Sequence, residues 1–153
     1  MLKKNAIISE LTWRDSGGQE HTLAQYSRHK AVVFFFYPMD FTRVCTGQAC
    51  YFRDVYGEIA AQGGVVFGVS LDDDATHEKF RTHHRLPYAL IYDHDRALSK
   101  KFGTLWLWGL WRNKRVTYII RPSDGKIMDV IHAERDAQVH ADRVLAYLRT
   151  SSL

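Results

Sequence analysis

A seven-residue apolar run, from Ala31 to Tyr37, constrains the fold of this chain more than any other feature. The run is rich in β-branched and aromatic side chains and carries no charge. Because successive side chains of a strand point to opposite faces of the sheet, such a run is buried only when both faces are covered. It therefore predicts a central strand, ended by Pro38, in a sheet with other elements packed on both sides.

Patterns in the rest of the chain predict alternating strands and helices. The expected elements are, in order, a hairpin over 11–23 that turns at Gly17-Gly18, the strand 31–37, a helix from about Thr42 to Gly63-Gly64, a strand over 65–70, a helix over 72–84, a strand over 90–92, a short helix over 95–102, a hairpin of 116–120 with 127–131, and a C-terminal helix with Ala141, Val144, Leu145 and Leu148 as its apolar stripe. This order predicts an α/β fold, a thioredoxin-like three-layer sandwich whose mixed central sheet is flanked by helices. With 153 residues and no repeat or linker, we expect one domain over 1–153.

Composition and charge exclude several classes of protein. Hydrophobic residues make up 46% of the chain, which excludes a disordered protein, and two cysteines are too few for a disulfide scaffold. The net charge of +4 is spread along the sequence, so nucleic-acid binding is not expected. Without a secretory signal or a membrane-spanning run, we expect a cytoplasmic protein with no membrane contact and no static disulfide.

The two cysteines, Cys45 and Cys50, fall in the first turns of the helix expected after Thr42. Five residues of helix would place their Cα atoms about 8–9 Å apart, beyond the ~7 Å limit for a disulfide, so a bridge would require unwinding. Cys45 would share the core-facing side with Phe52, while Cys50 would lie to one flank. Near the helix N-terminus, the helix dipole favours the reactive thiolate of Cys45. Two buried, unreactive cysteines are the plain alternative.

The residues around Cys45 resemble the active site of the peroxiredoxin family. Pro38, Thr42 and Cys45 reproduce the family's Pro-x-x-x-Thr-x-x-Cys motif between a buried strand and a helix. Arg115 opens a segment similar to the family's Arg-x-Thr-Phe-x-Ile, and an Asp-Gly turn follows it. The resemblance extends over about 11–148, nearly the whole chain.

The position of the second cysteine resembles the bacterioferritin comigratory protein, or peroxiredoxin Q, branch of that family. In this branch the cysteine at the place of Cys50 resolves the first one within a single chain, and here no cysteine follows Cys50. Three features depart from the usual pattern. Arg43-Val44 replace Pro-Gly, Gln48 replaces a common glutamate without its charge, and the N-terminal Pro-x-Phe segment is missing.

The resemblance implies a thiol-dependent peroxidase acting on hydrogen peroxide and organic hydroperoxides. Cys45 would attack the peroxide and become a sulfenic acid, Thr42 would offer its hydroxyl, and Arg115 would hold the thiolate charge and orient the peroxide. Pro38 would shield the site from water. Cys50 would then form a disulfide with Cys45, and thioredoxin or a similar dithiol would reduce it. No cofactor is implied, and we expect a monomer or weak dimer.

Other interpretations of the same residues remain open. A thioredoxin-like copper carrier would use a Cys-x-x-x-Cys pair and a distal histidine, whereas the spacing here is one residue longer. A redox sensor would form the same disulfide and pass it to a partner protein, and a one-cysteine peroxidase would turn over without Cys50. Thr42 could be only an N-cap, Pro38 only a strand stop, and Arg115 only an edge-strand charge.

Two further groups of side chains are unusual. The segment 105–111 carries Trp106, Trp108 and Trp111. These side chains could simply pack in the core or at the sheet edge, or they could form an apolar rim beside the active site. A second group could suggest a metal site: His83, His84, Asp93, His94 and Asp95. No zinc-type spacing joins these residues to the cysteines, so we expect no metal there and expect the histidines at the surface.

Overall fold

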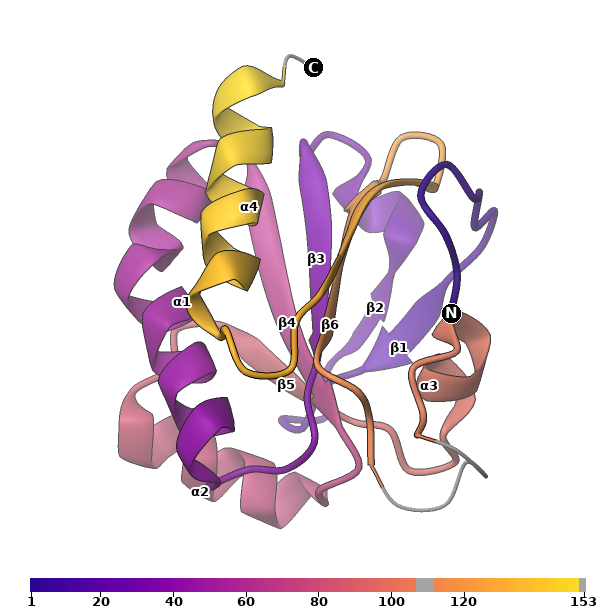
Figure 1. Ribbon diagram of the computed structural model, residues 1–153. Helices are drawn as coiled ribbons and strands as arrows, with labels where there is room; N and C mark the ends of the chain where they lie inside the picture. Colours follow the sequence, from indigo (N-terminus) through magenta and orange to yellow (C-terminus); the bar gives the residue numbers. More distant parts are fainter. Residues whose placement is uncertain (107–111, 152–153) are drawn as a thin grey trace.

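A five-stranded mixed sheet forms the middle layer of the protein, seen edge-on in Figure 1. The structure is a computed structural model that describes residues 1–106 and 112–151. The strand order is β5-β4-β3-β6-β7, with bounds β3 (Ala31–Phe36), β4 (Gly64–Ser70), β5 (Ala89–Tyr92), β6 (Val116–Arg121) and β7 (Lys126–His132). Strand β3 runs parallel to β4 and antiparallel to β6, so the predicted mixed sheet is confirmed.

Strand β3 is central and fully buried, as its apolar run predicts. Its six residues alternate between two separate hydrophobic cores. Val33 and Phe35 belong to one core, and Phe34 and Phe36 belong to the other. The run thus supplies apolar side chains to both faces of the sheet at once.

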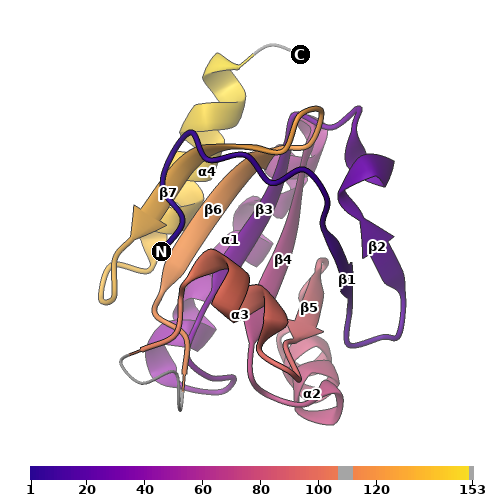
Figure 2. The same cartoon turned by 90° about the vertical axis from the view of Figure 1, so that its right-hand side faces the viewer.

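Three helices cover one face of the sheet: α1 (Arg43–Ala61), α2 (Asp74–His84) and α4 (Gln138–Thr150). The other face is covered by α3 (Ala97–Phe102), by the hairpin of β1 (Thr12–Arg14) and β2 (Glu20–Thr22), and by the short 3-10 helix η1 (Leu23–Tyr26). Figure 2 shows α3 and the hairpin in front of the sheet and α4 behind it. This is the expected three-layer α/β sandwich.

Most predicted boundaries agree with the observed ones to within two residues. Helix α2 begins at Asp74 rather than at 72, because Asp73 is its N-cap and accepts the N–H of Thr76 at 2.8 Å. The predicted stripe of α4 is buried at all four positions. No helix within 1–106 and 112–151 is both long and apolar enough to cross a bilayer.

Candidate active site

The loop 37–42 joins the carboxyl end of β3 to α1 and is anchored by a buried polar network. The Tyr37 hydroxyl donates to Asp40 Oδ1 at 2.5 Å, and His77 Nδ1 lies 2.6 Å from Asp40 Oδ2. The backbone N–H of Asp40 donates to the carboxylate of Asp72 at 2.8 Å. These bonds tie the loop to the segment after β4 and to α2, so the start of α1 is held from several sides.

Cys45 lies in the first turn of α1 and faces the core, with only 2% of its surface exposed. Arg115 immediately precedes β6, and the register of β3 with β6 pairs Phe36 with Val116. This pairing brings Arg115 to the edge of the sheet where α1 begins. Its Nη2 donates to Cys45 Sγ at 3.2 Å, and the arginine is itself 4% exposed.

The guanidinium of Arg115 makes its other hydrogen bonds to uncharged acceptors. Nη1 donates to Oε1 of the fully buried Gln48 at 2.6 Å, and Nε donates to the Glu134 carbonyl at 2.9 Å. In the described part of the chain, no carboxylate forms an ion pair with this guanidinium. The sulfur of Cys45 is therefore the one contacted group there that can carry a compensating negative charge.

Thr42 occupies the N-cap position of α1, as predicted, but its side chain does not cap the helix. The hydroxyl donates instead to the Met39 carbonyl at 2.8 Å, which leaves its oxygen lone pairs free to accept a hydrogen bond. The first helical bond runs from Thr46 N to Thr42 O at 2.8 Å. Pro38 is half-buried in the same loop, directly after Tyr37.

Cys50 is half-buried on the flank of α1, and both cysteines are free thiols. The helix is continuous through both residues, so the estimated Cα separation of about 8–9 Å holds for this state. Burial raises the pKa of the Cys50 thiol above its ordinary value, with an opposing effect of the nearby Arg53. The Tyr88 hydroxyl, also buried, donates to the Ala49 carbonyl at 2.6 Å, beside Cys50.

Exposed apolar side chains flank the site. Met39, Phe41 and Val44 are each more than a third exposed, and Phe41 has a backbone φ of 63°. That left-handed conformation costs a non-glycine residue roughly 1–3 kcal/mol. Trp106 is 43% exposed. Trp108 and Trp111 lie outside the described residues, so of the three tryptophans considered from the sequence only Trp106 is placed.

Three possible metal ligands converge near the loop, though they are not the ones considered from the sequence. Ligand atoms of Asp40, Asp72 and His77 all lie within 4.8 Å of one another. Each already has protein partners, because Ser70 Oγ donates to Asp72 at 2.5 Å and His77 Nε2 donates to the Ile91 carbonyl at 3.0 Å. The three side chains are thus joined by hydrogen bonds to one another or to neighbouring groups of the loop, β4 and β5.

The histidines considered from the sequence lie at or near the surface. His83 and His94 are exposed, and His84 is half-buried with its ring 5.0 Å from that of Phe80. Asp93, in contrast, is buried and accepts the N–H groups at the start of α3. It is thus a helix-capping group.

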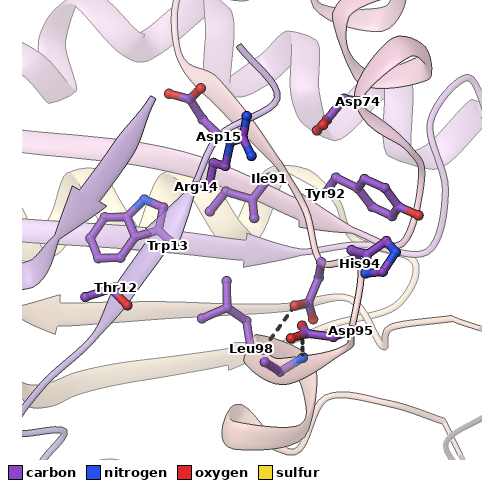
Figure 3. Close-up of a pocket in the computed structure, with 12 residues that line it drawn as sticks. Thr12, Trp13, Arg14, Asp15, Asp74, Ile91, Tyr92, His94, Asp95 and Leu98 are labelled. Carbon is purple, nitrogen blue, oxygen red and sulfur yellow. Dashed lines mark hydrogen bonds between the residues drawn. The ribbon is translucent and has the colours of Figure 1, made fainter. Parts of the chain in front are cut away.

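A separate cavity of about 540 Å³ lies on the opposite face of the sheet (Figure 3). Trp13 stands on one side of it, and Tyr92 and His94 stand on the other. Trp13 and Leu98 belong to the core on the α3 side, whereas Cys45 belongs to the core on the α1 side. The lining of the cavity also includes residues of the edge strand β5 and Asp74 of α2, so the cavity lies at that edge of the sheet.

Sequence reasoning missed several residues that shape the site. Asp40 and His77 were not considered, although His77 lies three residues before the buried Phe80 on α2, a spacing that indicates a core-facing position. Gln48 was noted only as a departure, yet it lies three residues after Cys45 and so shares its helical face. Glu134 follows a strand end and carries no sequence pattern that could have identified it.

The comparisons with known proteins agree with the fold. Residues 4–130 match the model of the AhpC/TSA family. A putative peroxiredoxin of Mycobacterium tuberculosis is 33% identical over 150 residues, covering 97% of both chains. The chloroplastic peroxiredoxin Q of Suaeda salsa is also 33% identical over 150 residues, covering 97% of this chain and 69% of the relative.

Solved structures of peroxiredoxins have the same fold as this chain. The crystal structure of peroxidoxin BcpB from Mycobacterium tuberculosis superimposes with a TM-score of 0.91 at 33% identity, covering all of both chains. Peroxiredoxin Q from Xanthomonas campestris gives a TM-score of 0.81 at 29% identity, covering 91% of this chain and 89% of that one.

Fold, site and relatives together define a thiol-dependent peroxidase, an oxidoreductase with a thioredoxin-like fold. This chain belongs to the AhpC/TSA family, within its bacterioferritin comigratory protein or peroxiredoxin Q branch. The fold, the family and the reaction class predicted from the sequence are thereby confirmed.

Proposed function

We propose that Cys45 is the peroxidatic nucleophile of this enzyme and Cys50 its resolving thiol. The observation that carries the proposal is the 3.2 Å contact between Arg115 Nη2 and Cys45 Sγ, made between two buried side chains. Arginine stays protonated at any physiological pH. A buried guanidinium without a carboxylate partner is costly to desolvate, and ionisation of Cys45 offsets that cost. The pairing therefore favours the thiolate, which is the reactive form.

In the first step the thiolate of Cys45 attacks one peroxide oxygen. A sulfur–oxygen bond forms, the O–O bond breaks, and the departing oxygen takes a proton to leave as water or an alcohol, so that Cys45 is oxidised to a sulfenic acid. Thr42 can accept the peroxide O–H, because its own hydroxyl proton is engaged with the Met39 carbonyl. The backbone N–H groups in the first turn of α1 have no acceptor within the helix, so they can stabilise charge on the reacting oxygens.

In the second step the Cys50 thiolate attacks the sulfenic sulfur, the sulfur–oxygen bond breaks, and the departing hydroxide takes a proton to leave as water as the Cys45–Cys50 disulfide forms. The first turns of α1 must unwind for the two sulfurs to meet. Burial raises the pKa of the Cys50 thiol in the helical state, and unwinding that exposes this thiol removes the effect. Thioredoxin or a similar dithiol then reduces the disulfide by thiol–disulfide exchange.

Hydrogen peroxide and organic hydroperoxides are the proposed substrates. A solved relative, the bacterioferritin comigratory protein of Xanthomonas campestris, is described by its alkyl peroxide reduction activity. The exposed Met39, Phe41 and Val44 near Cys45 suit an organic substrate. We further propose that 1–153 acts as one cytoplasmic domain, as a monomer or weak dimer. Pro38 would shield the thiolate from water.

The test is to mix the fully reduced protein with one equivalent of hydrogen peroxide, following tryptophan fluorescence and identifying the product by mass spectrometry. We expect a rate orders of magnitude above that of free cysteine and a Cys45–Cys50 disulfide. Cys50→Ser should react as fast but stop at the sulfenic acid, and Cys45→Ser should not react. A rate like that of free cysteine would overturn the peroxidatic role of Cys45. Full turnover of Cys50→Ser with a dithiol would indicate the one-cysteine mechanism instead.

A further inference from the structure

We propose that Glu134 is a positioning residue for peroxide reduction, which holds Arg115 in place against the Cys45 sulfur. The inference rests on the proposed role of Arg115. Glu134 contacts Arg115 at both ends. Its carboxylate accepts the backbone N–H of Arg115, with Oε1 at 3.0 Å and Oε2 at 3.3 Å, and its carbonyl accepts the side-chain Nε at 2.9 Å.

This double contact arises where the β6–β7 ladder ends. The last strand pair joins Val116 to His132, and one more backbone bond follows, from Ala133 N to Arg115 O at 3.3 Å. Beyond that point the chain turns away toward α4, and no further strand residue can accept the Arg115 N–H. The Glu134 carboxylate takes the place of the missing ladder acceptor.

The segment that carries Glu134 is itself held from two sides. On the outer side, His132 Nε2 lies 3.0 Å from Glu134 Oε1. On the inner side, the fully buried His140 donates from Nε2 to the Ala133 carbonyl at 2.9 Å, and Thr117 donates to its Nδ1 at 2.7 Å. Burial lowers the pKa of His140 to about 4, so the ring is neutral at physiological pH and its tautomer is set by these two partners.

Glu134 fixes the position of Arg115 without pairing its own negative charge with the guanidinium. An arginine side chain has several rotatable bonds, and fixing the backbone N–H and Nε restricts the position of the terminal nitrogens. The Glu134 carboxylate is directed to the backbone N–H, and only its neutral carbonyl contacts the guanidinium. The positive end of Arg115 is thereby held in place while it remains available to the sulfur.

The experiment compares Glu134→Ala, Glu134→Gln, Arg115→Ala and the double variant Arg115→Ala/Glu134→Ala. The readout is the second-order rate constant of the reduced proteins with hydrogen peroxide. Glu134→Ala should react about tenfold more slowly, because Arg115 loses one of its two anchors. Glu134→Gln keeps an acceptor oxygen and should stay within about threefold of the parent. In the Arg115→Ala background, Glu134→Ala should cause no further loss.

Arg135→Ala, at an exposed position in the same loop, is the control and should leave the rate unchanged. Thermal melts of each variant establish that it is folded at the assay temperature. A normal rate for Arg115→Ala would show that the proposed role of Arg115 fails. A slow Arg115→Ala with a normal Glu134→Ala would overturn the role of Glu134 alone. Equal losses for Glu134→Ala and Glu134→Gln, or a further loss in the double variant, would also overturn it, because the effect would then come from charge or from the fold.

Discussion

Arg115 Nη2 lies 3.2 Å from Cys45 Sγ, although 70 positions separate the two residues in the chain. The contact depends on the register of β3 with β6, which pairs Phe36 with Val116 and so places Arg115 beside the start of α1. A shift of that register by one residue would turn Arg115 to the other face of the sheet. The chemistry of the thiol is therefore coupled to the pairing of the central strands.

Gln48→Glu should slow the reaction with peroxide. A carboxylate at this buried position would pair with Arg115 Nη1, now 2.6 Å from the glutamine oxygen, and would compete with the Cys45 sulfur for the guanidinium. We expect the second-order rate constant with hydrogen peroxide, measured by stopped-flow fluorescence, to fall by roughly tenfold. Gln62→Glu, the same change at the far end of α1, is the control. An unchanged rate constant in Gln48→Glu would contradict the prediction.

Gly47→Ala should stabilise the protein and slow disulfide formation. A Cβ at Gly47 would meet nothing within 4 Å beyond its chain neighbours and the backbone of its own helix, so alanine fits without a clash. Alanine favours helix over glycine by about 0.5–1 kcal/mol, and helix must be lost for Cys50 to reach Cys45. We expect the free energy of unfolding to rise by a similar amount. Because about the same energy is added to the barrier, the Cys45–Cys50 disulfide should form roughly two- to fivefold more slowly.

Gly57→Ala is the matched control for that change. This position lies on the same helix and also has no atom within 4 Å, but it lies beyond the segment that unwinds. It should raise the free energy of unfolding in urea by a similar amount and leave the rate of disulfide formation unchanged. Equal slowing by the two variants would mean that unwinding extends through most of α1.

Tyr88→Phe should speed disulfide formation while leaving the first peroxide step unchanged. The buried Tyr88 hydroxyl donates to the Ala49 carbonyl at 2.6 Å, and burial raises its pKa well above its ordinary value, so it remains a donor. Its loss should lower the free energy of unfolding by about 1 kcal/mol and free the backbone next to Cys50. Rapid-quench mass spectrometry would resolve the two steps. Tyr118→Phe, which removes a hydroxyl on the opposite face of the sheet, should destabilise the protein without speeding resolution.

His140 should make the protein less stable in mild acid. Burial lowers its pKa from 6.5 to about 4, so between these values the unfolded chain binds a proton that the folded protein does not. The stabilisation is present above about pH 6.5 and is lost as the pH falls toward 4, amounting to about 3 kcal/mol in the free energy of unfolding. Urea unfolding at several pH values should show a shallower pH dependence for His140→Gln than for the parent. The exposed His94, replaced in the same way, is the control, and parallel curves for parent and His140→Gln would contradict the assignment.

The sequence predicted most of the fold because its signals are local. The apolar run of β3, the helical spacing of Phe52 and Ile59, and the Asp-Gly turn between β6 and β7 each reflect the periodicity of one element. Thr42 shows the limit of such rules. Its residue type predicted a cap, and the backbone position is correct, but its hydroxyl donates to the Met39 carbonyl and accepts no N–H of the helix.

The sequence by itself determined that a cysteine follows a buried strand at the start of a helix, with a second cysteine too far along that helix to bond without unwinding. These properties depend on residue types a few positions apart. Only the tertiary structure decided which groups surround the sulfur. Strand register brought Arg115 to Cys45, and a chain turn brought Glu134 to Arg115. Contacts between distant segments follow from how elements pack together, and no local pattern records that packing.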